Sequence, residues 1–151
     1  AFEKTKGFSD LRAGEDIDLT FRLWKKGFET QLIDSAFVYH KRRNSITSFF
    51  KQTFAFGTAR PKLNKKYPKT AKLTYWFPTV FIIGFDLSIL LLIFGYWQLA
   101  AFYVVYFILI YSDATIRNKD FRVGFLSIFT SLTQFMGYGL GFLESQFFKK
   151  N

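Results

Sequence analysis

Three long runs of apolar residues in the second half of the chain limit what it can fold into. Residues 75–94 contain a single charged residue, Asp86, whereas residues 96–112 and 123–143 contain none. At a rise of 1.5 Å per residue, about twenty helical residues cross a hydrocarbon layer roughly 30 Å thick. The sequence therefore predicts a membrane region, residues 75–148, with two or three transmembrane helices that correspond to these runs.

The composition of the whole chain supports a lipid environment. Half of its 151 residues are hydrophobic and 22 residues are Phe, a larger apolar share than a soluble core of this size can bury. The absence of cysteine excludes disulfides, thiol nucleophiles and Cys-ligated metal sites. The chain begins at Ala1 without the basic start and apolar core of a signal peptide, and we expect it to be the C-terminal fragment of a longer protein.

The net charge of +10 arises mostly from residues 41–72, which include the cluster Lys41, Arg42 and Arg43. A basic cluster directly before a membrane segment suits anionic lipid headgroups. Nucleic acid is not an expected partner, because the basic run contains no groove-reading helix and adjoins helices of lipid length. Membrane lipids are the expected partner instead.

The Lys and Arg residues also predict an orientation in the membrane. The segment before residue 75 and the polar loop expected at residues 113–122 are both basic, so both should be cytoplasmic, with two crossings between them. A third crossing would place Lys149 and Lys150 outside. Because the third run is also the richest in hydroxyl and amide side chains, the alternative that it lies in the interface or re-enters stays open.

The first half of the chain predicts three local elements. Glu15–Lys26 has apolar residues at helical spacing and is followed by Gly27, a typical helix stop. Residues 29–39 suit a strand or an extended arm. Ser45 is the expected N-cap of an amphipathic helix that lies on the bilayer, and a basic linker at residues 62–74 then leads into the membrane.

Two adjacent carboxylates, Glu15 and Asp16, fall in the first turn of the first predicted helix. The unpaired backbone N–H groups and the helix dipole favour the ionised form there, and an ionised carboxylate can act as a base. Acidic residues are also a general signal of a helix start. On these residues alone, a capping role and a catalytic role both stay open.

Several short segments within residues 1–61 have an order and spacing that resembles the end of the catalytic domain in membrane-associated family 2 glycosyltransferases. They are Gly7-Phe8, Gly14-Glu15-Asp16-Ile17-Asp18-Leu19, Arg22, Gly27-Phe28, Ala36-Phe37-Val38-Tyr39-His40, Gln52 and Gly57-Thr58-Ala59-Arg60. The resemblance implies a mainly α chain. Its residues 1–61 would be the C-terminal remnant of an α/β GT-A domain, with the short helix, the strand or extended arm and the interfacial helix, followed by the transmembrane helices.

The resemblance also implies an activity: inverting transfer of a sugar from a nucleotide-sugar donor to a lipid-linked or surface-polysaccharide acceptor. Asp16 matches the catalytic base of the family, with Glu15 as its partner. The expected location is the bacterial inner membrane, with the catalytic portion in the cytoplasm. Because the nucleotide-binding half is not among these residues, the fragment should be inactive alone.

The donor side of the site would be only partly present. His40, the sole histidine, is similar to a C-terminal histidine that many GT-A enzymes direct at the metal or the diphosphate. The implied cofactor is a divalent cation, Mg²⁺ or Mn²⁺. Such ions favour oxygen ligands, so His40 would be at most one ligand among several and the missing half would bind most of the ion.

The remaining implied site residues lie on either side of these groups. Arg60 and Gln52 are expected in the donor diphosphate or metal region, since a guanidinium can bind a diphosphate through two parallel hydrogen bonds. Gly7 and Phe8 are expected on the acceptor side. Gln52 and Arg60 are also similar to the Gln-x-x-Arg-Trp element of processive relatives, but the spacing is longer and no Trp follows.

A second function stays open, that of a small non-enzymatic membrane protein such as a transporter subunit or scaffold. The membrane region itself favours it. Asp86 should face the bundle interior or a partner, because an unpaired charge at mid-bilayer costs at least about 2.5 kcal/mol. Gly137 and Gly141 form a small-x-x-x-small pair that would let another helix approach closely.

Overall fold

The described part of the computed structural model comprises residues 1–11, 13–40 and 44–148. It is mainly helical, which confirms the predicted class, and it contains no strand. Lys41, Arg42 and Arg43, which are predicted to contact lipid headgroups, lie outside the described residues. So do Lys149 and Lys150, for which a third crossing predicts a position on the outer side of the membrane. The short helical turns are η1 Glu3–Thr5, η2 Pro68–Thr70, η3 Leu73–Trp76 and η4 Glu144–Phe148.

The first long element, α1 Glu15–Lys25, agrees with the predicted first helix. It ends at Lys25, and Gly27 follows with a φ of 78° and an N–H that donates to the Trp24 carbonyl at 3.0 Å, which closes the last turn.

The chain then runs through residues 28–40 without regular secondary structure, with a turn at residues 34–35 where the Ala36 N–H donates to the Ile33 carbonyl at 3.1 Å. Of the two alternatives predicted for residues 29–39, the strand is wrong for the described residues. A strand needs a neighbouring strand to pair its backbone hydrogen bonds, and the described residues contain no such neighbour.

The predicted amphipathic helix is α2 Ile46–Lys66. Ser45 caps it as predicted, since its side chain accepts a hydrogen bond from the Ser48 N–H at 3.2 Å. The helix continues past residue 61, so the first part of the predicted basic linker is helical. Leu63, which is only 1% exposed, is packed within that continuation.

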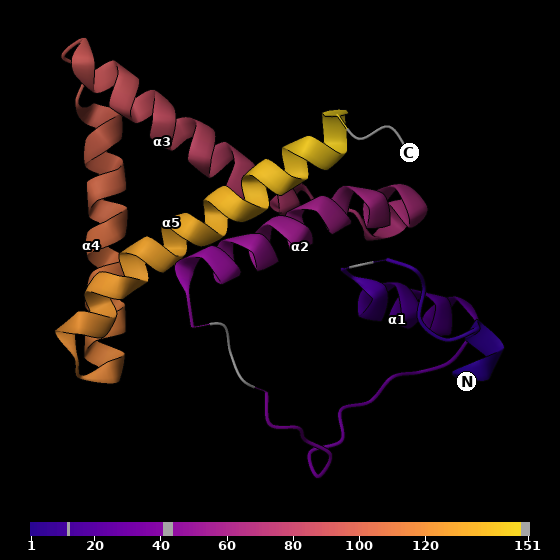
Figure 1. The fold of residues 1–151 in the computed structure, drawn as a ribbon. Coiled ribbons are helices and arrows are strands. Elements are labelled where there is room, and N and C mark those ends of the chain that lie inside the picture. The colour runs from indigo at the N-terminus through magenta and orange to yellow at the C-terminus, as the bar shows by residue number, and fades with distance from the viewer. Residues whose placement is uncertain (12, 41–43, 149–151) are drawn as a thin grey trace.

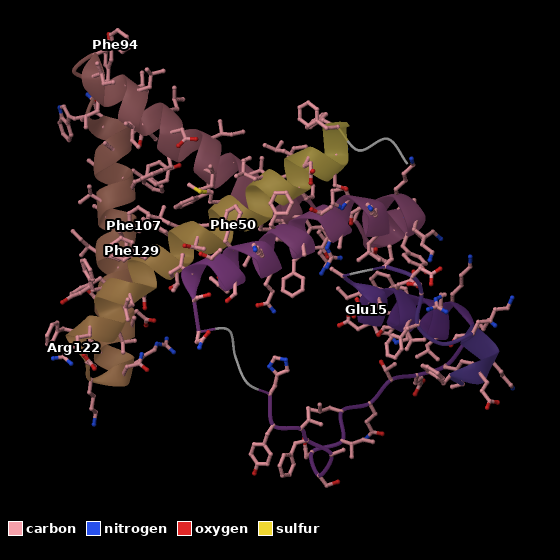
Figure 2. The ribbon with its side chains drawn as sticks, viewed as in Figure 1. Glu15, Phe50, Phe94, Phe107, Arg122 and Phe129 are labelled. Carbon is pink, nitrogen blue, oxygen red and sulfur yellow. The ribbon has the colours of Figure 1, made fainter. Side chains whose placement is uncertain are left out.

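Two helices form the predicted hairpin, α3 Phe77–Ile93 and α4 Gln98–Asn118. Gly95, with φ of 85°, lies in the turn between them, and Figure 2 labels Phe94 at this tip. The helical stretches Leu73–Ile93 and Gln98–Asn118 are long and apolar enough to cross a membrane. Only 22% and 6% of their most apolar windows are buried, unlike the core helix of a soluble protein.

The polar loop is shorter than the one predicted at residues 113–122, so the predicted bounds are wrong. Helix α4 continues to Asn118. Its last turn contains an ion pair between residues four apart, in which Arg117 Nε donates to Asp113 Oδ1 at 2.7 Å. Only Lys119 and Asp120 connect α4 to the next helix, α5 Phe121–Leu143. The Asp120 carboxylate caps α5 by accepting from the Arg122 N–H at 2.8 Å.

The last long helix, α5 Phe121–Leu143, lies across the open end of the hairpin and closes a triangle with α3 and α4 (Figure 1). Its Gly124 lies against Tyr111 and Thr115 of α4, and its Gly139 lies against the first turn of α3. Fifteen residues separate the two glycines, about 22 Å along a helix. Aromatic and aliphatic side chains fill the triangle: Phe81, Ile82, Phe85, Leu99, Tyr103, Tyr106, Phe107, Leu132 and Phe135.

Helix α5 also packs along α2, and Figure 1 shows the two helices side by side. A Cβ atom on Gly141 would lie 2.2 Å from the Phe54 carbonyl oxygen, and one on Gly137 would lie 2.1 Å from Thr53 Oγ1. Gly57 of α2 is in equally close contact with the Tyr138 carbonyl. The backbones therefore touch, and the close approach predicted for Gly137 and Gly141 is confirmed, with α2 as the partner.

This packing favours the alternative that α5 lies in the interface. Among the described residues, only the α3 and α4 stretches pass the length and apolarity test for a span. Helix α5 instead runs parallel to α2, which carries exposed or half-exposed basic residues along its length. Asp86 is exposed on α3, so it does not face the bundle interior, because the inward positions there hold aromatic rings.

We expect Gly141→Ala to weaken the α2–α5 pair. Helix propensity alone would make the variant more stable by about 1 kcal/mol, but the new methyl group would collide with the Phe54 carbonyl oxygen at 2.2 Å. Overpacking of this kind costs about 1–3 kcal/mol. Thermal unfolding in detergent, followed by circular dichroism, should therefore show a lower midpoint.

The matched control is Leu140→Ala, because Leu140 is the preceding residue of α5 and is 44% exposed. Its midpoint should change less than that of Gly141→Ala. A higher midpoint for Gly141→Ala than for the unchanged protein would contradict the backbone contact.

Candidate functional site

A buried carboxylate joins α1 to the end of α2. Asp18 is 0% exposed, and its Oδ1 accepts hydrogen bonds from Lys66 Nζ at 2.6 Å and from the Tyr67 hydroxyl at 2.8 Å. Its Oδ2 accepts from Arg22 Nε at 2.8 Å, one turn along α1. Both oxygens thus have charged or polar donors, which is how a buried charge is accommodated.

Arg22 extends this network to the N-terminal segment. Its other two guanidinium nitrogens donate to the carbonyl oxygens of Thr5 and of Gly7, the latter at 2.6 Å. Gly7 has a φ of 67°, and Phe8 beyond it is 59% exposed in an edge contact with Phe2. The two predicted acceptor-side residues therefore lie beside Arg22.

The network determines the ionisation of Asp18. Burial alone would raise the pKa of the carboxyl group, but the hydrogen bonds from Lys66, Tyr67 and Arg22 outweigh burial and lower the pKa from 3.8 to about 2. The same contact raises the pKa of Lys66. Burial, followed by the hydrogen bond to Asp18, raises the pKa of Tyr67. The carboxylate stays charged at all ordinary pH values.

Gly14, the N-cap of α1, packs against α2 one turn before Asp18. It is buried, with a φ of 81°, and a Cβ atom there would lie 3.0 Å from Leu63 Cδ1 and 3.6 Å from the Ala59 methyl group. Glycine is favoured for both the positive φ and the close approach. Contacts at Gly14 and at Asp18 therefore hold α1 at two points, and this sets where its first turn points.

That first turn borders a hollow of about 410 Å³, which we call the Asp16 hollow. Glu15 and Asp16 line it from α1, and Lys51 and Gln52 line it from α2. Asp16 is exposed and Glu15 is half-buried; Figure 2 labels Glu15 at the start of α1. The structure thus brings together three of the predicted site residues, Glu15, Asp16 and Gln52, with a lysine beside them.

A second, larger hollow of about 630 Å³ adjoins the first, and we call it the His40 hollow. His40 and Ser45 line it together with Phe49 of α2 and residues of α5. Gln52 lines both hollows. His40 and Asp16 therefore line neighbouring hollows that share the Gln52 side chain as a lining residue.

Arg60 lies apart from these hollows. Its guanidinium carbon is 4.3 Å from the centre of the Tyr75 ring, in η3 before α3. A planar guanidinium stacks well on an aromatic face. This contact links α2 to the start of the membrane hairpin, and a diphosphate near Gln52 would not reach Arg60 without movement of one of them.

The described residues alone do not fit a Mg²⁺ or Mn²⁺ site, since no group of three or more His, Asp or Glu residues converges among them. Residues 16–18 have the sequence Asp-Ile-Asp, which matches an Asp-x-Asp pair. Asp16 is exposed, whereas Asp18 is buried and both of its oxygens accept hydrogen bonds from basic or hydroxyl donors. The two carboxylates cannot share an ion. His40 would supply a single nitrogen ligand.

Three residues that hold the site together were not predicted: Asp18, Lys66 and Tyr67. The spacing of Asp18 and Arg22, four residues apart in a helix, is a signal for an ion pair that sequence could have provided. Lys66 lies 48 residues from Asp18 and Tyr67 lies 49 residues away. No local pattern connects residues at that separation.

Comparisons with known proteins gave no match for this chain, whether with family models, with curated proteins or with solved structures.

Acid should release α1 from α2. Because folding lowers the pKa of Asp18 from 3.8 to about 2, the ionised group stabilises the docked state above pH 4, and this stabilisation is lost as the pH falls from about 4 to about 2. The shift corresponds to roughly 2 kcal/mol. Protection factors of the α1 amides in hydrogen exchange should fall over that pH range.

Asp18→Asn tests the origin of this acid step. The variant should show α1 protection roughly tenfold or more below normal at neutral pH, with no further loss on acidification, because the titrating group is gone. Asp10→Asn is the control, since Asp10 is an exposed carboxyl in the preceding segment. An acid step that persists in Asp18→Asn would rule out Asp18 as its source.

Proposed function

We propose that the chain is the membrane-proximal part of an inverting glycosyltransferase that uses a nucleotide-sugar donor. The observation that carries the proposal is the position of Asp16: an exposed carboxylate in the first turn of a helix held at two points, at the edge of a hollow also lined by Gln52. The resemblance of residues 1–61 to family 2 glycosyltransferases supports the same role. The acceptor is lipid-linked or a surface polysaccharide.

Asp16 is the proposed base. As the acceptor oxygen bonds to the anomeric carbon, the bond from that carbon to the nucleotide diphosphate breaks, and its electron pair leaves with the diphosphate. The acceptor proton moves to an Asp16 oxygen. A positioned base contributes typically about 10²–10⁴-fold to the rate. Glu15 is its proposed partner.

The donor is proposed to lie on the other side of Gln52. His40 would face the diphosphate or contribute one metal ligand, and a divalent cation would be held mostly by a nucleotide-binding half that this sequence does not include. The proposed location is the cytoplasmic face of the bacterial inner membrane. Two helices of membrane-spanning length and apolarity, α3 and α4, support membrane association.

One observation favours the alternative of a non-enzymatic membrane scaffold. Of the three acidic residues in the first turn of α1, Asp18 has a purely structural role, and Glu15 and Asp16 would need no more than helix capping in a scaffold. A scaffold would bind no nucleotide sugar. Titration of the complete protein with nucleotide diphosphates therefore separates the two functions.

Asp16→Asn should abolish sugar transfer by the complete protein while nucleotide-sugar binding stays within about twofold. The amide keeps the size of the side chain but cannot take the proton, so the expected loss of kcat is about 10²–10⁴-fold. Radiolabelled transfer assays and calorimetric titration of the donor measure the two quantities.

Asp34→Asn is the matched control, because Asp34 is an exposed carboxyl in the segment of residues 28–40. Its turnover should equal that of the unchanged protein. Near-normal turnover of Asp16→Asn would reject Asp16 as the base.

Arg60→Ala tests the diphosphate role inferred for Arg60. If the guanidinium leaves Tyr75 to bind the donor, the variant should bind a nucleoside diphosphate at least tenfold more weakly, since charge-assisted hydrogen bonds contribute about 1.5–3 kcal/mol. Tyr75→Leu removes the ring but keeps the guanidinium, and should not weaken binding. Unchanged affinity in Arg60→Ala would assign Arg60 to the contact with Tyr75 alone.

A further inference from the structure

A third hollow continues the series that starts at Asp16. It measures about 440 Å³ and lies where α4 ends and α5 begins, between Tyr111, Phe121 and Phe125; we call it the Phe125 hollow. Leu126 lines both this hollow and the His40 hollow, just as Gln52 lines both the His40 and Asp16 hollows. The three hollows therefore adjoin one another in series, and we call this series the track.

The chemistry of the lining changes along this track. At the Asp16 end, carboxylates and Lys51 face the cavity. The His40 hollow combines polar groups with the apolar side chains of Ile46 and Phe49. The Phe125 hollow is almost wholly apolar, and its one charged residue, Arg122, stacks over the Phe121 ring at 5.8 Å. A ligand that matches all three must be polar at one end and apolar at the other.

The apolar end of the track lies at the foot of the membrane hairpin. Tyr111 belongs to α4, which has the length and apolarity of a span, and the Phe125 and Leu126 side chains are each 57% exposed on α5. In Figure 2, Glu15 and Arg122 mark the two ends of the track. An acyl or isoprenoid chain can enter there directly from a bilayer, whereas a polysaccharide would find few hydrogen-bonding groups.

We propose that this track binds a membrane amphiphile, with its hydrocarbon chain against Leu126 and Phe125, its headgroup at His40 and Gln52, and its outermost hydroxyl near Asp16. The inference rests on the proposed function only in the last step, where that hydroxyl becomes the acceptor. It therefore selects a lipid-linked acceptor over a surface polysaccharide. The lipid site itself exists whether or not Asp16 is a base.

The test uses the protein in phosphatidylcholine vesicles that contain phosphatidylglycerol with a photoreactive diazirine on one acyl chain. After irradiation, mass spectrometry locates the labelled residues. Labelling should concentrate within residues 44–52 and 121–130. Leu126→Trp places a larger side chain at the residue that lines both the His40 and Phe125 hollows and should reduce this labelling at least fivefold. Leu140→Trp makes the same change at an exposed α5 residue away from the track, and its labelling should stay within twofold.

Two outcomes would overturn the proposal: labelling confined to the exposed faces of α3 and α4, or labelling of residues 121–130 that Leu126→Trp does not reduce. Protection of the track by an excess of soluble oligosaccharide would also overturn it in favour of a polysaccharide. Asp34→Asn, at an exposed carboxyl that lines none of the three hollows, should leave both labelling and transfer unchanged. Loss of labelling in Leu126→Trp with transfer intact would refute the acceptor role of the bound lipid, whereas loss of transfer in Asp16→Asn reports on the base.

Discussion

Direct backbone contact between α2 and α5 is the interaction on which the rest of the structure depends. Side chains cannot fit between the two helices at Gly57, Gly137 and Gly141, where a Cβ atom would lie 2.1–2.2 Å from an atom of the other helix. Each of these glycines weakens an isolated helix by about 1 kcal/mol, and the packing across the contact compensates. Because α5 also closes the α3–α4 hairpin, this contact joins the membrane region to everything before it.

On the other side of α2, one buried carboxylate attaches α1. Asp18 bonds to Lys66 and Tyr67 at the end of α2, and Arg22 carries the network on to the N-terminal segment. Removing one partner of such a buried cluster costs more than forming the cluster gains. Asp16, two residues earlier on α1, points to a different side of the helix and is exposed, so two acidic residues of a single helical turn have different surroundings.

The sequence alone predicted the helices well and their packing poorly. The Ser45 cap, the Gly27 stop and the apolar runs are local signals, and they gave α1, α2 and the hairpin nearly in place. The predicted loop at residues 113–122 is too long, because the polar residues at the end of α4 pair along the helix and do not interrupt it. The Asp18 cluster and the Asp16 and His40 hollows depend on residues tens of positions apart, and no periodicity encodes such contacts.

The glycines at 137, 139 and 141 alternate between two neighbours. The first and third touch α2, whereas Gly139 touches Pro78 and Thr79 at the start of α3. Helix α5 is therefore clamped from both sides over a single turn, and α2 cannot slide without moving the base of the hairpin. In a bilayer, the lengths and crossing points of α2, α3 and α5, together with the contacts that hold α1 on α2 at Gly14 and Asp18, therefore set the height of the Asp16 carboxylate above the lipid.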